Sequence, residues 1–74
     1  MMNHNVDHPT HYTKGPIECI DAIESALGAD GFINYCHGNV MKYMWRWRDK
    51  NGIEDLDKAI WYIERMKNTL KKIG

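Results

Sequence analysis

A run of residues in the middle of the chain combines cations, an amide and an aromatic ring at helical spacing. If residues 35–48 form a helix, residues three and four apart become neighbours on one stripe, which then holds Tyr35, Gly38, Asn39, Lys42 and Arg46. Glycine costs about 1 kcal/mol against alanine inside a helix, so Gly38 indicates that something approaches the backbone closely there. The pattern predicts a site for a phosphate-bearing ligand with stackable rings.

Phosphate at this stripe would be held by side chains, because the sequence contains no P-loop. Arg46 offers a planar fork for phosphate oxygens, and Lys42, one helical turn away, adds a mobile charge. Asn39 has both a donor and an acceptor for a base edge or a ribose hydroxyl. The alternative is a solvated basic face whose cations pair with Asp49, Glu54 or Asp57.

The N-terminal arm carries a polar ring pair, His11-Tyr12, just after Pro9-Thr10. Either ring could stack on a base or close over a ligand. The alternative is that Tyr12 only anchors the arm on the core.

Two acidic pairs invite a metal interpretation. Glu18-x-x-Asp21 and Glu54-x-x-Asp57 loosely resemble the acidic pairs of all-α nucleotide pyrophosphohydrolases related to MazG, which would imply Mg²⁺ held against a triphosphate. Acids also favour first turns of helices for dipole reasons alone, and we prefer that explanation. The four histidines and two cysteines show no zinc-ligand spacing, so we predict no metal, no cofactor and no catalytic residue.

Length and charge narrow the class of protein. Seventy-four residues make one domain of marginal stability by itself, and three Trp, four Tyr, one Phe and five Met are a heavy load of large side chains, so we expect a homo-oligomer, a tetramer before a dimer. The net charge is zero, which argues against a long nucleic acid as partner. No signal peptide or membrane span is apparent, and Cys19 and Cys36 read as reduced apolar residues, so we expect a cytoplasmic protein with no membrane partner.

Hydrophobic spacing predicts an all-α fold, a compact three-helix domain over residues 17–74 after an irregular arm over residues 1–16. The first helix would begin near Pro16 and end at Gly28. The second would run from its N-cap Asp30 to about Arg48, where Lys50-Asn51-Gly52 would end it with a left-handed turn. The third would open with acids and close with lysines. Its seam of apolar side chains could face the core or a second subunit; the seam comprises Leu56, Ala59, Ile63, Met66, Leu70 and Ile73.

Together these motifs resemble a widespread family of small bacteriophage proteins of unknown function. The resemblance rests on His11-Tyr12, Ile17-Glu18, Gly31-Phe32, Tyr35-Cys36-x-Gly38-Asn39-x-x-Lys42-Tyr43-x-x-Arg46, Lys50, Glu54-Asp55-Leu56-x-Lys58-Ala59 and Tyr62. Similar sequence forms the C-terminal part of a phage nucleotide kinase that has no P-loop, whose long cysteine-rich N-terminal region is absent here. A further similarity is to anti-CBASS sponge proteins, tetramers that sequester cyclic dinucleotide immune signals.

The resemblance implies a nucleotide ligand, best matched by a cyclic dinucleotide such as cGAMP that is bound without turnover for immune evasion in the infected bacterial host. The ligand-binding residues would be His11, Tyr12, Tyr35, Gly38, Asn39, Lys42, Tyr43, Arg46 and Lys50. The enzyme alternatives are a nucleoside monophosphate kinase and a Mg²⁺-dependent nucleotide pyrophosphohydrolase. A purely structural interaction module would leave Lys42 and Arg46 in solvent.

Overall fold

The computed structural model describes residues 13–14 and 17–73. Two short strands, β1 (Thr13–Lys14) and β2 (Ile17–Glu18), form an antiparallel pair in which Thr13 lies opposite Glu18. Two helices follow, α2 (Cys19–Arg46) and α3 (Ile53–Ile73), joined by a turn over residues 47–52. The prediction of an all-α fold is confirmed, since helices make up nearly all of the described chain.

The prediction of three helices is wrong, because the first two are parts of one helix with a sharp bend. Gly28 lies inside α2 with φ 76° and ψ 172°, a conformation available to glycine and costly for other residues. Asp30, predicted as the N-cap of a second helix, is therefore an interior residue of α2. The helix also starts later than predicted, at Cys19, since Ile17 and Glu18 belong to β2.

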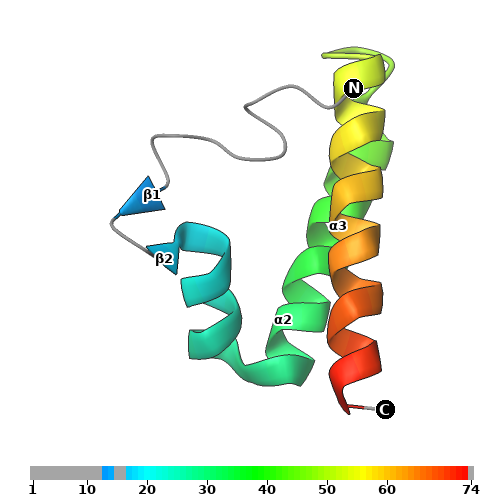
Figure 1. The fold of residues 1–74 in the computed structure, drawn as a ribbon. Coiled ribbons are helices and arrows are strands. Elements are labelled where there is room, and N and C mark those ends of the chain that lie inside the picture. The colour runs from blue at the N-terminus through cyan, green and yellow to red at the C-terminus, as the bar shows by residue number, and fades with distance from the viewer. Residues whose placement is uncertain (1–12, 15–16, 74) are drawn as a thin grey trace.

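The bend divides α2 into two segments with different neighbours. In Figure 1 the segment after the bend runs alongside α3 in the opposite direction, and the segment before it leans away from that pair. The core lies between α2 and α3. Its most buried residues are Phe32, Cys36, Tyr43, Asp55, Ala59 and Thr69.

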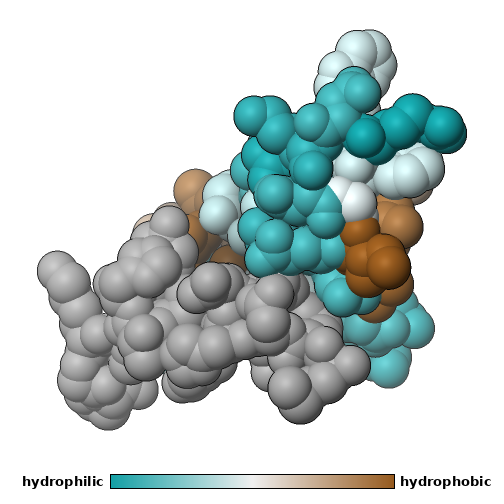
Figure 2. Space-filling view, turned by 90° about the horizontal axis from the view of Figure 1, so that it is seen from above, coloured by the Kyte–Doolittle hydropathy of each residue, from teal (hydrophilic) through white to brown (hydrophobic). Residues whose placement is uncertain are grey.

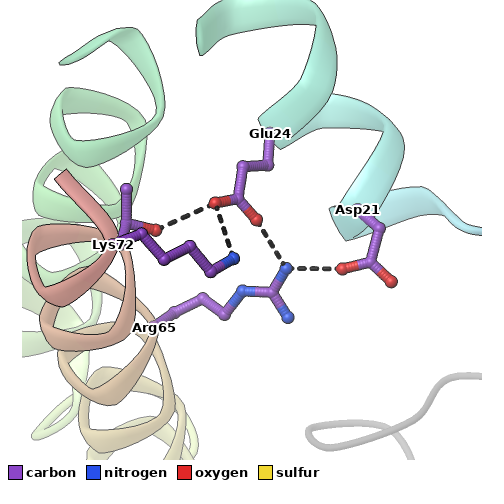
Figure 3. A network of polar contacts seen from close by, with 5 residues as sticks. Asp21, Glu24, Arg65 and Lys72 are labelled. Atoms are coloured by element: carbon purple, nitrogen blue, oxygen red, sulfur yellow. Dashed lines mark hydrogen bonds and ion pairs between the residues drawn. The ribbon is translucent and has the colours of Figure 1, made fainter. Parts of the chain in front are cut away.

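Polar side chains fasten the segment before the bend to the C-terminal half of α3 (Figure 3). Arg65 donates to Asp21 and, at 3.0 Å, to Glu24. The other Glu24 carboxylate oxygen accepts from the Thr69 hydroxyl at 3.1 Å and from Lys72 at 3.5 Å. One carboxylate on α2 thus takes three donors from successive turns of α3, which fixes the angle of the bend.

The turn and the ends of α3 follow the predicted signals. Gly52 has the positive φ, 55°, expected of a left-handed turn, and its N–H donates to the carbonyl of Trp47 at 2.9 Å. Acids occupy the first turn of α3 and Lys71 and Lys72 its last, as the helix dipole favours. These predictions are confirmed.

The predicted apolar seam of α3 divides between core and surface. Ala59 is 2% exposed, whereas Ile63 and Leu70 are 41% and 49% exposed. Figure 2, a view from above onto the end that carries the turn, shows hydrophilic residues over most of the described surface, with hydrophobic residues in separate patches. No helix in the described part of the chain is long and apolar enough to cross a membrane.

The bend at Gly28 yields a stability prediction. Gly28→Ala should lower the free energy of unfolding by about 1–3 kcal/mol, because alanine is strained at this backbone conformation even though nothing lies within 4 Å of the added Cβ. Gly38→Ala is the matched control: the space around its Cβ is equally open, but Gly38 is helical, so it should gain up to about 1 kcal/mol. Urea unfolding followed by circular dichroism measures both. Equal effects of the two substitutions would contradict the assigned bend.

Candidate basic and aromatic site

Three cations from two helices converge on the ring of Tyr43. Lys42 Nζ lies 4.6 Å from the ring centroid and Arg46 Cζ 4.9 Å, both from α2. Lys58 Nζ approaches from α3, at 5.5 Å. All three distances fall within the range of cation–π attraction, so this buried ring holds a cluster of positive charge at the junction of the helices. We call Lys42, Tyr43, Arg46 and Lys58 the Tyr43 cluster.

A buried carboxylate orients one of these cations. Arg46 donates through Nε and Nη2 to Asp55 at 3.2–3.3 Å, and the backbone N–H of Asn51 donates to the same carboxylate at 3.1 Å. The Asp55 side chain is fully buried and that of Arg46 is about one-third exposed. Arg46 therefore forms an ion pair within the protein. Its partner is Asp55, and not Asp49, Glu54 or Asp57, the three acids considered from the sequence.

The two lysines of the Tyr43 cluster differ from Arg46 in this respect. Within the described residues neither Lys42 nor Lys58 forms an ion pair, and Lys42 is exposed while Lys58 is half-buried. Their charge is therefore available for an anion, and they project from facing helices. The cluster as a whole carries an excess of positive charge over the single Asp55 carboxylate.

The predicted stripe on α2 runs beside this cluster. Gly38 is exposed, and a Cβ placed there would meet no atom within 4 Å, so a flat group has room to approach the backbone. Asn39 uses its amide nitrogen on its own helix, donating to the Tyr35 carbonyl at 3.0 Å, which leaves its oxygen as the acceptor for a partner. Open backbone and amide thus lie within a turn of Lys42.

Aromatic rings continue from the cluster into the core. Tyr43 stacks with Tyr62 of α3 at 6.0 Å between centroids, and Tyr62 meets Tyr35 edge-on at 6.2 Å. Burial, with the neighbouring Tyr35 and Tyr43, raises the pKa of Tyr62, so it stays a neutral phenol. Tyr35 also stacks on Phe32 at 6.0 Å and is half-buried, so its ring packs mainly against other core rings.

The structure brings together most of the predicted site residues that it describes: Tyr35, Gly38, Asn39, Lys42, Tyr43 and Arg46. Lys50 is exposed in the turn that follows α2. His11 and Tyr12 lie outside the described residues. Lys58 and Tyr62 were missed as site residues, although both belong to the motifs that carry the family resemblance, and that was the available signal.

The cysteines and acids show no second site. Cys36 is buried, and burial raises the pKa of its thiol to about 11, which agrees with the predicted role as a small apolar residue. Both cysteines are free. Asp21, from the first predicted acidic pair, is bound to Arg65, and in the part of the chain that the structure describes no three His, Cys, Asp or Glu side chains gather as a metal-binding group.

The fold and this site define a helical-hairpin protein with a basic and aromatic face. A family model described as a protein of unknown function, DUF3310, matches residues 6–64, and the chain belongs to that family. It is 35% identical over 65 residues to the Gene 1.7 protein of Enterobacteria phage T3, a match that covers 81% of this chain. The chain spans 40% of the length of that relative. No solved structure matches significantly.

These comparisons establish a phage protein of the predicted family. They extend the resemblance found in the sequence to a named phage relative, without assigning an activity.

The buried carboxylate predicts a loss of stability in acid. Burial alone would raise the pKa of Asp55, but its hydrogen bonds from Arg46 and Asn51 outweigh that effect and leave the pKa below its ordinary 3.8. Because the pKa is lower in the folded state, the stabilisation is complete above about pH 4 and is lost as the pH falls through the lowered value. Asp55→Asn should therefore be less stable than wild type at pH 7, with a flatter pH dependence below about pH 4.

Urea unfolding over this pH range is the measurement, with Asp49→Asn as the control. Asp49 is an exposed acid of the same turn, and its replacement should leave the profile unchanged. A profile for Asp55→Asn that parallels wild type down to acid pH would contradict the assigned ion pair.

Proposed function

We propose that this phage protein binds a nucleotide at the Tyr43 cluster and holds it without chemical change, as a sponge for a cyclic dinucleotide such as cGAMP in the infected host cell. The observation that carries the proposal is the convergence of Lys42 and Lys58 from two helices on one ring. Two lysines that form no ion pair with a described residue can neutralise phosphate, and the open backbone at Gly38 gives a base or ribose room to lie flat.

The ligand class rests on two further arguments. A nucleotide combines phosphate with flat rings, which matches cations next to aromatic and open surface better than a plain inorganic anion does. The choice of a cyclic dinucleotide as the ligand rests on the resemblance to anti-CBASS sponge proteins. Its two phosphodiesters would suit two lysines without demanding the deep pocket that a terminal triphosphate needs.

The enzyme alternatives stay open as proposals of lower rank. Resemblance to a phage nucleotide kinase supports a nucleoside monophosphate kinase. Mg²⁺-dependent pyrophosphohydrolysis would need acids that gather around a metal, whereas Asp21 and Glu24 are held by Arg65. Binding without turnover requires no such group of metal-binding acids.

We predict that Lys42→Ala and Lys58→Ala each weaken cGAMP binding by about 1.5–3 kcal/mol, roughly 10- to 150-fold, the scale of a charge-assisted hydrogen bond. Isothermal titration calorimetry of each variant is the measurement. Arg48→Ala is the matched control, since Arg48 stacks on Trp47 at 4.7 Å, away from Tyr43. Arg46→Ala is a poorer probe, because it would leave the Asp55 carboxylate buried without its guanidinium.

Two results would count against the site. Wild-type affinity in both lysine variants would show that these lysines belong to a solvated basic face and not to a binding site. Equal weakening in Arg48→Ala would indicate a general charge effect. Gly38→Leu adds a steric test, because its side chain would fill the open space and should block binding while the helix is kept.

Turnover separates the sponge from the enzymes. Protein incubated with cGAMP, or with a panel of mono- and triphosphates and Mg²⁺, should release unaltered nucleotide after heating. Mass spectrometry of the released fraction identifies it. Conversion that requires Mg²⁺ would favour an enzyme.

The predicted homo-oligomer, a tetramer or a dimer, is part of the same proposal. Short length and exposed apolar side chains on α3 support it.

A further inference from the structure

An exposed heptad stripe runs along α3 on the side away from Tyr43. Its positions are spaced three and four residues apart, as in the a and d positions of a coiled coil: Ile53, Leu56, Ile60, Ile63, Lys67 and Leu70. Leu56 is half-buried and the other five positions are exposed, with Ile60 55% and Ile53 77% exposed. Ile60 follows Lys58 by two residues, which is about 200° around the helix, so this stripe and the Tyr43 cluster lie on nearly opposite sides of α3.

Charges beside the stripe divide α3 into an acidic first part and a basic last part. Asp57 and Glu64 are succeeded along the same edge by Lys71, while Lys67 lies on the stripe itself. Lys67 Nζ lies 3.7 Å from the Glu64 carboxylate, and both side chains are more than half exposed. Exposed isoleucine and leucine flanked by opposite charges at opposite ends form a surface that complements itself when one copy is reversed.

We propose that a second copy of this chain covers this stripe, with the two α3 helices antiparallel. A parallel pair would set Lys67 against Lys67 of the partner subunit and the acidic ends side by side. An antiparallel pair brings Lys71 near Asp57 of the partner subunit, and the two helix dipoles also oppose each other. Charge therefore selects the antiparallel orientation.

The same charges select the register. Antiparallel heptads pack a positions against d positions, and one such register layers Ile60 on Leu70 of the partner subunit and Ile63 on Lys67 of the partner subunit. The two Glu64 carboxylates then lie near the symmetry axis, each beside its own Lys67. A shift by one heptad would layer Ile60 on Ile63 of the partner subunit and set Asp57 beside Glu64 of the partner subunit on both sides of the axis, two acidic pairs in place of one. In the favoured register Ile53 extends beyond the overlap.

Cysteine cross-linking tests the orientation. Ile60→Cys and Leu70→Cys proteins, mixed and oxidised, should form a disulfide-linked dimer, whereas each alone should not exceed the wild-type background set by Cys19 and Cys36. A parallel pair would cross-link each single variant with itself, and that result would overturn the proposal. No cross-linking in the mixture would overturn it as well.

Charge substitution tests the surface and the register. Ile60→Lys should raise the dissociation constant of the assembly by roughly a hundredfold or more in analytical ultracentrifugation, with the helical circular dichroism kept because Ile60 is already exposed. Ile53→Lys is the matched control and should leave assembly unchanged. Dissociation by Ile53→Lys would overturn the register, and a monomeric wild type at high concentration would overturn the surface.

Discussion

The Asp55 carboxylate is the constraint on which the rest of the arrangement depends. It is fully buried at the start of α3 and accepts hydrogen bonds from the guanidinium of Arg46, the last residue of α2, and from the N–H of Asn51 in the turn. A buried charge is costly unless it is paired and hydrogen-bonded, so this carboxylate specifies how the two helices meet. Because Asp55 lies in the first turn of α3, its pairing with Arg46 also positions the next turn of that helix against α2.

The site follows from that junction. Once Arg46 is tied to Asp55, Tyr43 one turn earlier on α2 faces Lys58 one turn later on α3, and the ring is enclosed by cations from both sides. At the other end of the hairpin Arg65 has an equivalent role, because it lies over the Phe32 ring at 5.6 Å while binding Glu24. Two arginines bound to carboxylates thus fix the two ends of one aromatic core.

Sequence patterns predicted what depends on a single helix. The stripe from Tyr35 to Arg46, the glycine turn at Gly52 and the lysines closing α3 all follow from local spacing and from the helix dipole. Gly28 was correctly identified as the point where the helical backbone is interrupted, although the segments on its two sides form one element, α2. Sequence alone could not show how the two segments are oriented at this bend, since contacts from Arg65, 44 residues from Asp21, hold it.

Contacts between helices were the other feature that the sequence did not predict. Lys58 stands in a recognisable motif, yet its proximity to Tyr43 depends on the crossing of α2 and α3, which periodicity along one helix does not contain. Asp55 was hidden for a related reason, because an acid in a first turn already has a sufficient explanation in the helix dipole. Its burial becomes evident only when Arg46 is placed beside it.

The central claim is that the Tyr43 cluster, with the open backbone at Gly38, is a nucleotide site. Two-dimensional amide NMR of isotopically labelled protein titrated with cGAMP tests it most directly. The account predicts saturable shifts concentrated at the amides of Gly38, Asn39, Lys42 and Lys58, with the exposed stripe around Ile60 and Ile63 unaffected. Saturable shifts confined to other residues, or none at millimolar ligand, would contradict it.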